Sequence, residues 1–422
     1  MDRVGVEEFR RSGLAEVQPV AEDESVGLGA AIGRVSSREV RSHLPLPWFR
    51  RSAVDGYALR AADRDERLTV VAKVTAGRPT ARRLGPGEAI EITTGAPMPD
   101  GADAVALVEE SERDGSYVRV REAVSPGAHV SPVGEDFQVD QVLLAPNQRI
   151  TPVTVAALAS QGHETVRVWR RPRVLVVSTG DELQPLGATL APGQVYDVNG
   201  AVLEAMVRTA GGDPVRAGVW EDRYDIVRAG MAAVQARDDW DILVTSGGTG
   251  ASIPVFQGRD VRELHDLLPA VAQELGTLIH HGIRMSPGRP TALARLGGRP
   301  AFLLPGWPYA VLVHFEMLVE PAIRRAAHLP PKRRIPVAAR LRDRLQPMPG
   351  FTWVIQVRLH AVAGEPPWAE PLLPPPPPSA SRVMTQMLAA DGYIIVEAET
   401  ELPKGHPVTV FVDPLRHQEG ES

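Results

Sequence analysis

Two acidic residues follow the most strand-like segment of the chain. The apolar run Val174–Val177 is short and β-branched, which predicts a fully buried strand of a parallel sheet. It ends at Ser178-Thr179-Gly180, and Asp181 and Glu182 come next. Ligands of open α/β sheets bind beyond the carboxyl ends of such strands. The two carboxylates could therefore hold Mg²⁺, which prefers oxygen ligands. Alternatively, they stand on a solvated turn or interact with the N-terminus of a helix.

Two more loops follow predicted strands in the same way. Ser246-Gly247-Gly248-Thr249 follows Ile242–Thr245, and Pro305-Gly306-Trp307-Pro308 follows Phe302–Leu304. Glycine-rich loops can present backbone N–H groups to a phosphate, although Gly-Gly pairs are most often plain turns. Three such loops at one end of a sheet favour a site for an anionic ligand. Neither a GxxxxGK[ST] nor a GxGxxG pattern is present, so a classical P-loop or dinucleotide site is not supported.

The bulk composition narrows the possible partners. The chain has 422 residues, which suggests two to four domains, and a formal net charge of −6, which argues against nucleic acid as the main partner. The absence of cysteine excludes disulfides, thiolate metal sites and cysteine nucleophiles. We expect a cytoplasmic protein without a membrane partner, because no apolar run approaches the ~18 residues of a membrane span and no secretory signal is evident.

The first part of the chain mixes helical and β signals. Residues 1–42 carry helical signals, with one helix expected over Val26–Ile32. Short β-like runs separated by Gly, Pro and Asp turns fill residues 67–145 and predict a small all-β module. A short helix with proline in its first turn is expected over Pro152–Ala159.

Strands and helices then alternate, which predicts a doubly wound parallel sheet. The helices are expected over residues 200–209, capped by Asn199, over 225–237 and over 261–275. Residues 331–416 return to β character. Within them, Pro374–Pro378 predicts a polyproline II loop.

The order of the motifs resembles the molybdopterin molybdenumtransferases, the family of MoeA and the gephyrin E domain. The matching segments run from residue 47 to residue 308 and read PWFRRSAVDGYAL, TTGAPMPDGADAV, GEDFQVDQVLL, RPRVLVVSTGDEL, VYDVNG, TSGGTG, SPGRPTAL and LLPGWP. Together they are highly specific, and the flanking segments extend the resemblance over nearly the whole chain.

The resemblance implies an α/β multidomain fold with four parts. These are an elongated helical linker domain (1–42 and 142–171), a small β domain (43–141), a molybdopterin-binding α/β domain with the doubly wound parallel sheet (172–330), and a C-terminal β-barrel domain (331–416). It also implies a homodimer in which the small β domain of one subunit closes the site of the other, and a molybdopterin adenylyltransferase as a partner.

The implied activity is insertion of molybdate into adenylylated molybdopterin, with Mg²⁺ and release of AMP. Catalytic roles would fall on Asp55, Thr94, Asp136 and Glu182, and metal ligation on Asp181, Glu182 and Asp260. The implied cofactor-binding residues are Ser178, Thr179, Gly180, Ser246, Gly247, Gly248, Thr249, Pro287, Gly288, Arg289, Pro305, Gly306 and Pro308.

The departures from the family pattern include two loops. The family usually has Gly-Gly-Val-Ser-Val-Gly followed closely by Asp, whereas here Thr249 follows the glycines and Asp260 comes later. The usual Leu-Pro-Gly-Asn-Pro has Trp307 in place of Asn. Two other hypotheses therefore stay open: a catalytically impaired molybdopterin-binding carrier, sensor or scaffold, and a phosphohydrolase of related fold acting on a nucleotide-like ligand.

Overall fold

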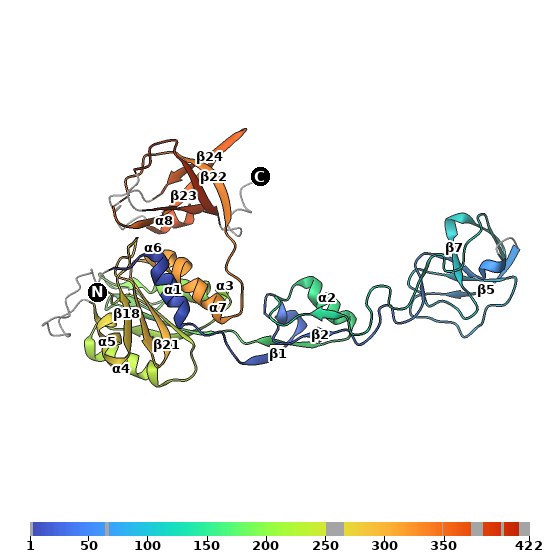
Figure 1. The fold of residues 1–422 in the computed structure, drawn as a ribbon, viewed down its shortest axis with the longest axis horizontal. Coiled ribbons are helices and arrows are strands. Elements are labelled where there is room, and N and C mark those ends of the chain that lie inside the picture. The colour runs from blue at the N-terminus through green and yellow to red at the C-terminus, as the bar shows by residue number, and fades with distance from the viewer. Residues whose placement is uncertain are drawn as a thin grey trace. The chain divides into compact units, whose positions relative to one another are not determined.

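The protein consists of two compact units, which are described separately below. A computed structural model describes residues 3–63, 67–249, 266–347, 349–372, 383–397 and 401–412. Unit 1 combines Met1–Glu24 with Trp169–Ser422, and unit 2 is Ser25–Val168. Figure 1 shows the elements of both units.

The core of unit 1 is a six-stranded sheet with the order β16-β13-β17-β21-β20-β18. The first four strands are parallel, and β20 and β18 are antiparallel to their neighbours. The strands span Asp213–Trp220 (β16), Arg173–Thr179 (β13), Ile242–Ser246 (β17), Arg299–Leu304 (β21), Ala292–Leu296 (β20) and Thr277–His281 (β18).

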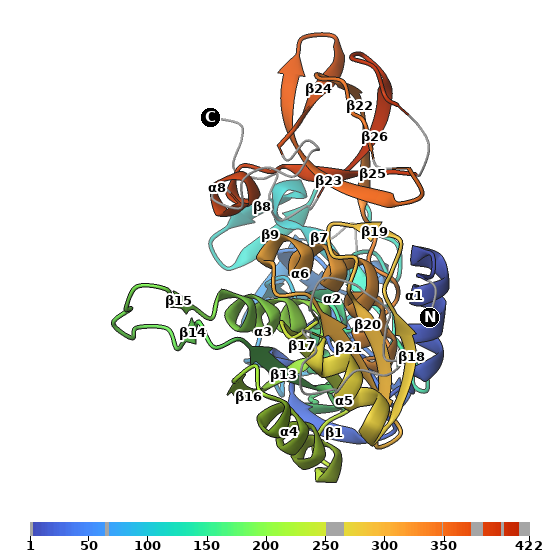
Figure 2. The same cartoon turned by 90° about the vertical axis from the view of Figure 1, so that its left-hand side faces the viewer.

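Helices cover both faces of this sheet, as Figure 2 shows, so the predicted doubly wound fold is confirmed. Alternate residues of β13 and β17 point to opposite faces: Val174 and Val176 pack on one side, Leu175 and Val177 on the other. The first face is covered by α1 (Val6–Glu16), α3 (Val198–Ala210), α6 (Pro308–His314), the π-helical turn η5 (Phe315–Val319) and α7 (Glu320–Ala326). The second is covered by α4 (Tyr224–Ala236) and α5 (Leu267–Leu275).

A closed five-stranded barrel completes unit 1. It closes because β23 pairs with both β24 and β25. A short strand of the α/β region, β19 (Met285–Ser286), also pairs with β23. The barrel strands are β22 (Ile335–Leu341), β23 (Thr352–Val362), β24 (Glu365–Pro371), β25 (Gly392–Val396) and β26 (Pro407–Val412), and helix α8 (Val383–Leu388) precedes β25.

Unit 2 contains the expected small β module and a helix-containing part. The module is a six-stranded sheet of order β7-β4-β6-β5-β9-β8. Its strands are β4 (Gly56–Leu59), β5 (Arg67–Val74), β6 (Glu88–Ile92), β7 (Ala104–Leu107), β8 (Ser111–Asp114) and β9 (Tyr117–Val120). The predicted helix appears as α2 (Pro152–Ser160), where Thr154 N–H donates to the capping hydroxyl of Thr151 over 3.2 Å. Three two-stranded sheets are also present. They pair β1 (Asp23–Gly27) with β12 (Thr165–Trp169), β2 (Val40–Arg41) with β11 (Val142–Leu144), and β3 (Arg51–Ser52) with β10 (Val130–Ser131).

Two local expectations are wrong. No α-helix forms over Val26–Ile32, because residues 23–27 pair as β1 with β12 and only a 3₁₀ turn, Leu28–Ala31, follows. Two glycines in this stretch also lower its helix propensity. Helix α3 is capped by Asp197 instead of Asn199, since Gly200 N–H donates to Asp197 Oδ1 over 2.9 Å.

Other expectations meet the described structure only in part. The expected linker segment 1–42 is divided, because α1 packs on the central sheet through Phe9 while residues from Ser25 onward belong to unit 2. Residues 261–265 of the expected helix 261–275, and Pro374–Pro378, lie outside the described residues. In the described ranges, no helix is long and apolar enough to cross a membrane.

One ion pair ties the starts of the two strands that carry the candidate site. Arg170, just before β13, donates to both carboxylate oxygens of Asp241, just before β17, over 2.6 and 2.9 Å, and Arg173 N–H donates to the same carboxylate over 2.6 Å. Burial opposes ionisation, but the donors from Arg170 and Arg173 prevail and lower the pKa of Asp241.

Replacing Asp241→Asn is therefore expected to reduce the free energy of unfolding by about 2 kcal/mol at neutral pH, because charge-assisted hydrogen bonds are lost. The folded-state pKa lies below the unfolded value of about 3.9, so the stabilisation is complete above that pH and is lost as the pH falls through the lower folded value. Urea unfolding across this range measures it. The matched control is Asp239→Asn, which removes an exposed pair with Arg237 and should change little. Equal effects of the two variants at all pH values would contradict this account.

Candidate active site

The carboxyl ends of three parallel strands lie level with one another. Ser178 of β13 is paired with Ser246 of β17, and Ser246 with Leu304 of β21. The three predicted loops therefore emerge side by side from one edge of the sheet. Backbone contact continues past the strands, since Gly247 N–H donates to the Leu304 carbonyl over 3.1 Å.

The glycines of the second loop are required by close backbone approach. A Cβ on Gly247 would lie 2.2 Å from the Thr179 carbonyl oxygen, and one on Gly248 would lie 2.8 Å from Thr179 Oγ1. Both glycines also have positive φ, +96° and +60°. A Cβ on Gly306 of the third loop would contact Gly247 Cα at 3.5 Å. The loops therefore form one continuous backbone surface at the strand ends.

Asn199 fastens the second loop to the third. Its Nδ2 donates to Ser246 Oγ and to the Gly306 carbonyl, both over 2.7 Å. The Gly306 carbonyl can only accept, so the amide orientation is fixed. Sequence reasoning treated Asn199 as a helix cap and missed this role, which joins residues far apart in the chain.

Asp197 fastens the first loop to helix α3. Its carboxylate is buried and accepts from Ser178 Oγ over 2.8 Å and from Gly200 N–H, and it forms an ion pair with Arg216 of β16. Gly200 leaves room for the guanidinium, because a Cβ there would lie 1.7 Å from Arg216 Nη1. The hydroxyls of Ser178 and Ser246 are thus both engaged inside the protein, which indicates that they shape the loops.

The predicted acidic pair stands at the exposed rim of these loops. Asp181 and Glu182 are both exposed, and Asp181 Oδ1 accepts from Asp222 N–H over 2.9 Å. Burial of its carboxylate raises the pKa of Asp222, and the charges of Asp181 and Glu182 raise it further. Asp222 is a third carboxylate at this edge that sequence reasoning missed. It is the second residue after β16, so its place after a strand is the available signal.

The Pro287-Gly288-Arg289 loop is held by a buried histidine. His314 Nε2–H donates to the Pro287 carbonyl over 2.6 Å, and its Nδ1 lies 2.7 Å from Thr291 Oγ1. Burial lowers the pKa of His314 to about 4, so the ring is neutral at physiological pH. Gly288 packs directly on this ring and has φ +98°.

The Arg289 guanidinium lies 5.1 Å above the ring of Phe351.

The third loop is anchored by aromatic side chains. Trp307 packs edge to face on Tyr309, with ring centroids 5.5 Å apart. Tyr309 Oη donates to the Val354 carbonyl over 2.8 Å and accepts from Gln356 N–H, which links α6 to the barrel strand β23. Pro308 begins α6, where its fixed φ suits the first helical position. Trp307 therefore replaces the family's amide with a packed anchor.

The three candidate residues of unit 2 lie on exposed loops of that unit. Asp55 Oδ1 accepts from both Thr94 N–H, over 2.6 Å, and Thr94 Oγ1, over 2.9 Å. These two bonds lower the pKa of Asp55 and keep it ionised. Asp136 is positioned by its N–H, which donates to the Leu46 carbonyl over 2.8 Å.

The structure thus brings together most but not all of the predicted residues. The strand-end loops of unit 1 converge, as do Asp55 and Thr94 in unit 2. Asp260 lies outside the described residues. Within the described ranges, no group of three or more His, Asp or Glu side chains is arranged to hold a metal by itself.

Comparison with known proteins confirms the resemblance. Residues 4–162 match the MoeA N-terminal region (domain I and II), and residues 175–325 match a probable molybdopterin binding domain. The chain is 34% identical over 337 residues to molybdopterin molybdenumtransferase 2 of Mycobacterium tuberculosis, covering 77% of this chain and 80% of that protein. The chain belongs to the molybdopterin molybdenumtransferase family.

The similarity extends through the C-terminal barrel. A Bacillus subtilis molybdopterin molybdenumtransferase is 30% identical over 421 residues, covering 96% of this chain and 93% of that protein. A crystal structure of the molybdopterin biosynthesis MoeA protein of Pyrococcus horikoshii matches with a TM-score of 0.77 and 30% identity, over 97% of this chain and 99% of that one. The family fold is therefore present along nearly the whole molybdenumtransferase chain.

The role of Asn199 can be tested by removing its donor. Asn199→Asp keeps the shape but sets a carboxylate against the Gly306 carbonyl, so we expect the free energy of unfolding to fall by about 1–3 kcal/mol. Thr209→Ala, at the other end of α3, is the control, since its hydroxyl bonds only within the helix. Urea unfolding gives the comparison. An Asn199→Asp protein as stable as the wild type would show that the loops are not held through this side chain.

Proposed function

We propose that this transferase acts in molybdenum cofactor biosynthesis by inserting molybdate into adenylylated molybdopterin, with Mg²⁺ and release of AMP. The observation that carries the proposal is the convergence of three glycine-bearing loops on one sheet edge rimmed by Asp181, Glu182 and Asp222. Backbone N–H groups at such an edge suit a phosphate-bearing ligand, and the acidic rim suits a cation that accompanies it.

The donor set at this rim fits Mg²⁺ held jointly with substrate. Mg²⁺ is commonly coordinated by one or two carboxylates together with phosphate oxygens of the substrate and water, and less often by protein ligands alone. Asp181 and Glu182 supply such oxygens in an exposed position. Mg²⁺ bound here would neutralise charge on the phosphate oxygens during cleavage of the phosphoanhydride. Asp260 remains a further proposed ligand.

The protein itself would bind and orient the substrate. The backbone surface of Gly247, Gly248 and Gly306 leaves space for close approach, and Asn199 and Asp197 hold that surface rigid. Preset geometry of this kind lowers the barrier by removing the cost of orienting the reactants. Molybdenum would be ligated by the sulfurs of molybdopterin, so the absence of cysteine presents no obstacle.

The carboxylates of unit 2 would complete the site from a second subunit. Asp55 is ionised and exposed, and it is rigidly held by Thr94, which suits a residue that meets a partner's ligand. Exposed apolar residues lie near Asp136, including Trp48, which is 66% exposed, and Leu44. Such residues favour an apolar contact with another chain. We therefore propose a homodimer, cytoplasmic and served by a molybdopterin adenylyltransferase. We also propose the four domains stated above, except that helix α1 of the 1–42 segment packs on the α/β domain.

The reaction is tested by measuring AMP release from adenylylated molybdopterin with molybdate and Mg²⁺. Glu182→Gln and Glu182→Ala are expected to lower the rate about 10²-fold or more. Asp213→Asn is the control, because Asp213 is an exposed carboxylate at the opposite end of the sheet. Tight ligand binding without AMP release, unchanged in Glu182→Ala, would overturn the transferase reaction and support a carrier. No ligand binding would contradict both.

A composite site predicts complementation between two inactive variants. When Asp55→Ala and Glu182→Ala subunits are mixed by co-expression, each mixed dimer should contain one intact site. About a quarter of wild-type activity should then return if subunits pair at random. Each variant alone serves as the control. Activity that stays at the level of the single variants would show that Asp55 and Glu182 do not act across subunits.

A further inference from the structure

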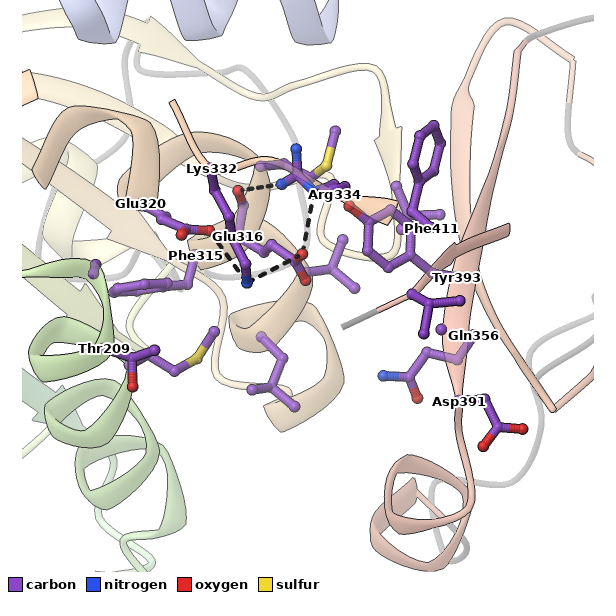
Figure 3. A pocket seen from close by; sticks show the side chains of 18 residues that line it. Thr209, Phe315, Glu316, Glu320, Lys332, Arg334, Gln356, Asp391, Tyr393 and Phe411 are labelled. Carbon is purple, nitrogen blue, oxygen red and sulfur yellow. Dashed lines mark hydrogen bonds and ion pairs between the residues drawn. The ribbon is translucent and has the colours of Figure 1, made fainter. Parts of the chain in front are cut away.

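A cavity separate from the strand-end loops lies inside unit 1, between the α/β region and the barrel. Its volume is about 310 Å³, at the lower end of the range for small-molecule sites. One wall comes from α3, α6 and η5, and the other from barrel strands β23, β25 and β26. Figure 3 shows the two walls facing each other.

The cavity lies toward the opposite end of α3 from the strand-end loops. Helix α3 starts at the site, where Asp197 and Asn199 hold the loops, and reaches the cavity with its last turns at Met206 and Thr209. Met206 and Thr209 follow Asn199 by seven and ten residues, roughly 10 and 15 Å along the helix axis. The backbone of Val354 and Gln356 holds Tyr309, which follows the third loop, but the side chains that line the cavity are separate from the proposed reacting groups.

The walls of the cavity include three aromatic and two thioether side chains among aliphatic and charged ones. Phe315, Tyr393 and Phe411 line it (Figure 3). Met206 and Met317 line it as well. Thioether and aromatic groups pack favourably on flat conjugated rings. This lining suits a planar aromatic ligand.

The charged side chains of the cavity already have partners. Glu316 pairs with Lys332 over 4.0 Å and with Arg334 over 3.3 Å, and Glu320 lies 3.9 Å from Lys332 (Figure 3). Asp391 accepts from Leu359 N–H over 2.7 Å. The three carboxylates outnumber the two cations, which disfavours an anionic ligand.

Gln356 leaves an acceptor unmet in this cavity. The residue is only 8% exposed, and its Oε1 has no hydrogen-bond partner among the described residues. It sits on β23 directly opposite Tyr393 of β25. A buried acceptor without a donor costs about 1–3 kcal/mol, and a ligand with an N–H group would remove that cost.

We propose that this cavity binds a neutral, planar heteroaromatic compound that carries an N–H or amino group, of purine or pteridine size. The ring stacks among the aromatic and methionine side chains, and the N–H donates to Gln356 Oε1. The site is independent of the proposed transferase reaction.

The probe for this site is 2-aminopurine, whose fluorescence is quenched on stacking. The full-length protein is expected to bind it, and Gln356→Leu should weaken binding at least fivefold by removing the acceptor. Met317→Trp should abolish binding by filling the cavity. Gln273→Leu, an exposed glutamine on α5, is the matched control and should bind like the wild type. Circular dichroism confirms that each variant is folded.

Three outcomes would overturn the proposal. The first is absence of binding to the wild type at millimolar probe. The second is binding unchanged by both cavity variants, which would place the probe elsewhere, including the candidate active site. The third is displacement from this cavity by AMP with higher affinity than the neutral base, which would show an anion site. AMP release measured in parallel separates this result from the proposed reaction, because both cavity variants should retain it.

Discussion

The structure depends above all on the parallel pairing of β13, β17 and β21. Backbone hydrogen bonds in register bring Ser178, Ser246 and Leu304 to the same level, so the chain leaves three strands at one edge. The register is fixed because alternate residues of each strand are buried on opposite faces of the sheet, so a slip by one residue would reverse both faces. The positions of the candidate loops therefore follow from the packing of the core.

Around that edge, the polar residues divide into two groups. Buried groups hold the backbone: Asp197 binds the first loop to α3, Asn199 joins the second loop to the third, and His314 holds the Pro287–Gly288 turn. Exposed carboxylates, Asp181 and Glu182, remain available to solvent and ligand. This division explains how a site made of loops can be rigid, because its backbone is fixed by buried hydrogen bonds while its reactive groups stay accessible.

The parts of the fold that the sequence predicts correctly are those with strong local patterns. The apolar runs before Ser178, Ser246 and Pro305 identify three central strands, and the short helix after Thr151 has both a cap and a first-turn proline. The stretch at Val26–Ile32 is different, because its structure is decided by pairing with β12, about 140 residues later. Local propensity carries no information about such a partner.

Local sequence patterns also do not reveal two residues of the candidate site, Asn199 and Asp222. Asn199 bonds to residues 47 and 107 positions away, so only the folded chain reveals its role. Asp222 follows β16, an edge strand interrupted by Pro214 and Gly218 and only partly buried, which gives no continuous apolar signal. In contrast, roles for Asp55 and Thr94 are implied by the family motifs alone. The structure adds that the two residues pair, through two hydrogen bonds to one carboxylate oxygen.

We expect the edge formed by β13, β17 and β21 to bind the reacting end of adenylylated molybdopterin. A crystal structure of the Glu182→Gln protein with this substrate, molybdate and Mg²⁺ tests it most directly. Phosphate density is expected against the backbone of Gly247, Gly248 and Gly306, with the cation beside Asp181. Asp55 of a second subunit is expected to approach the same ligand. Substrate bound at another edge of the sheet, or in a site completed without a second subunit, would contradict it.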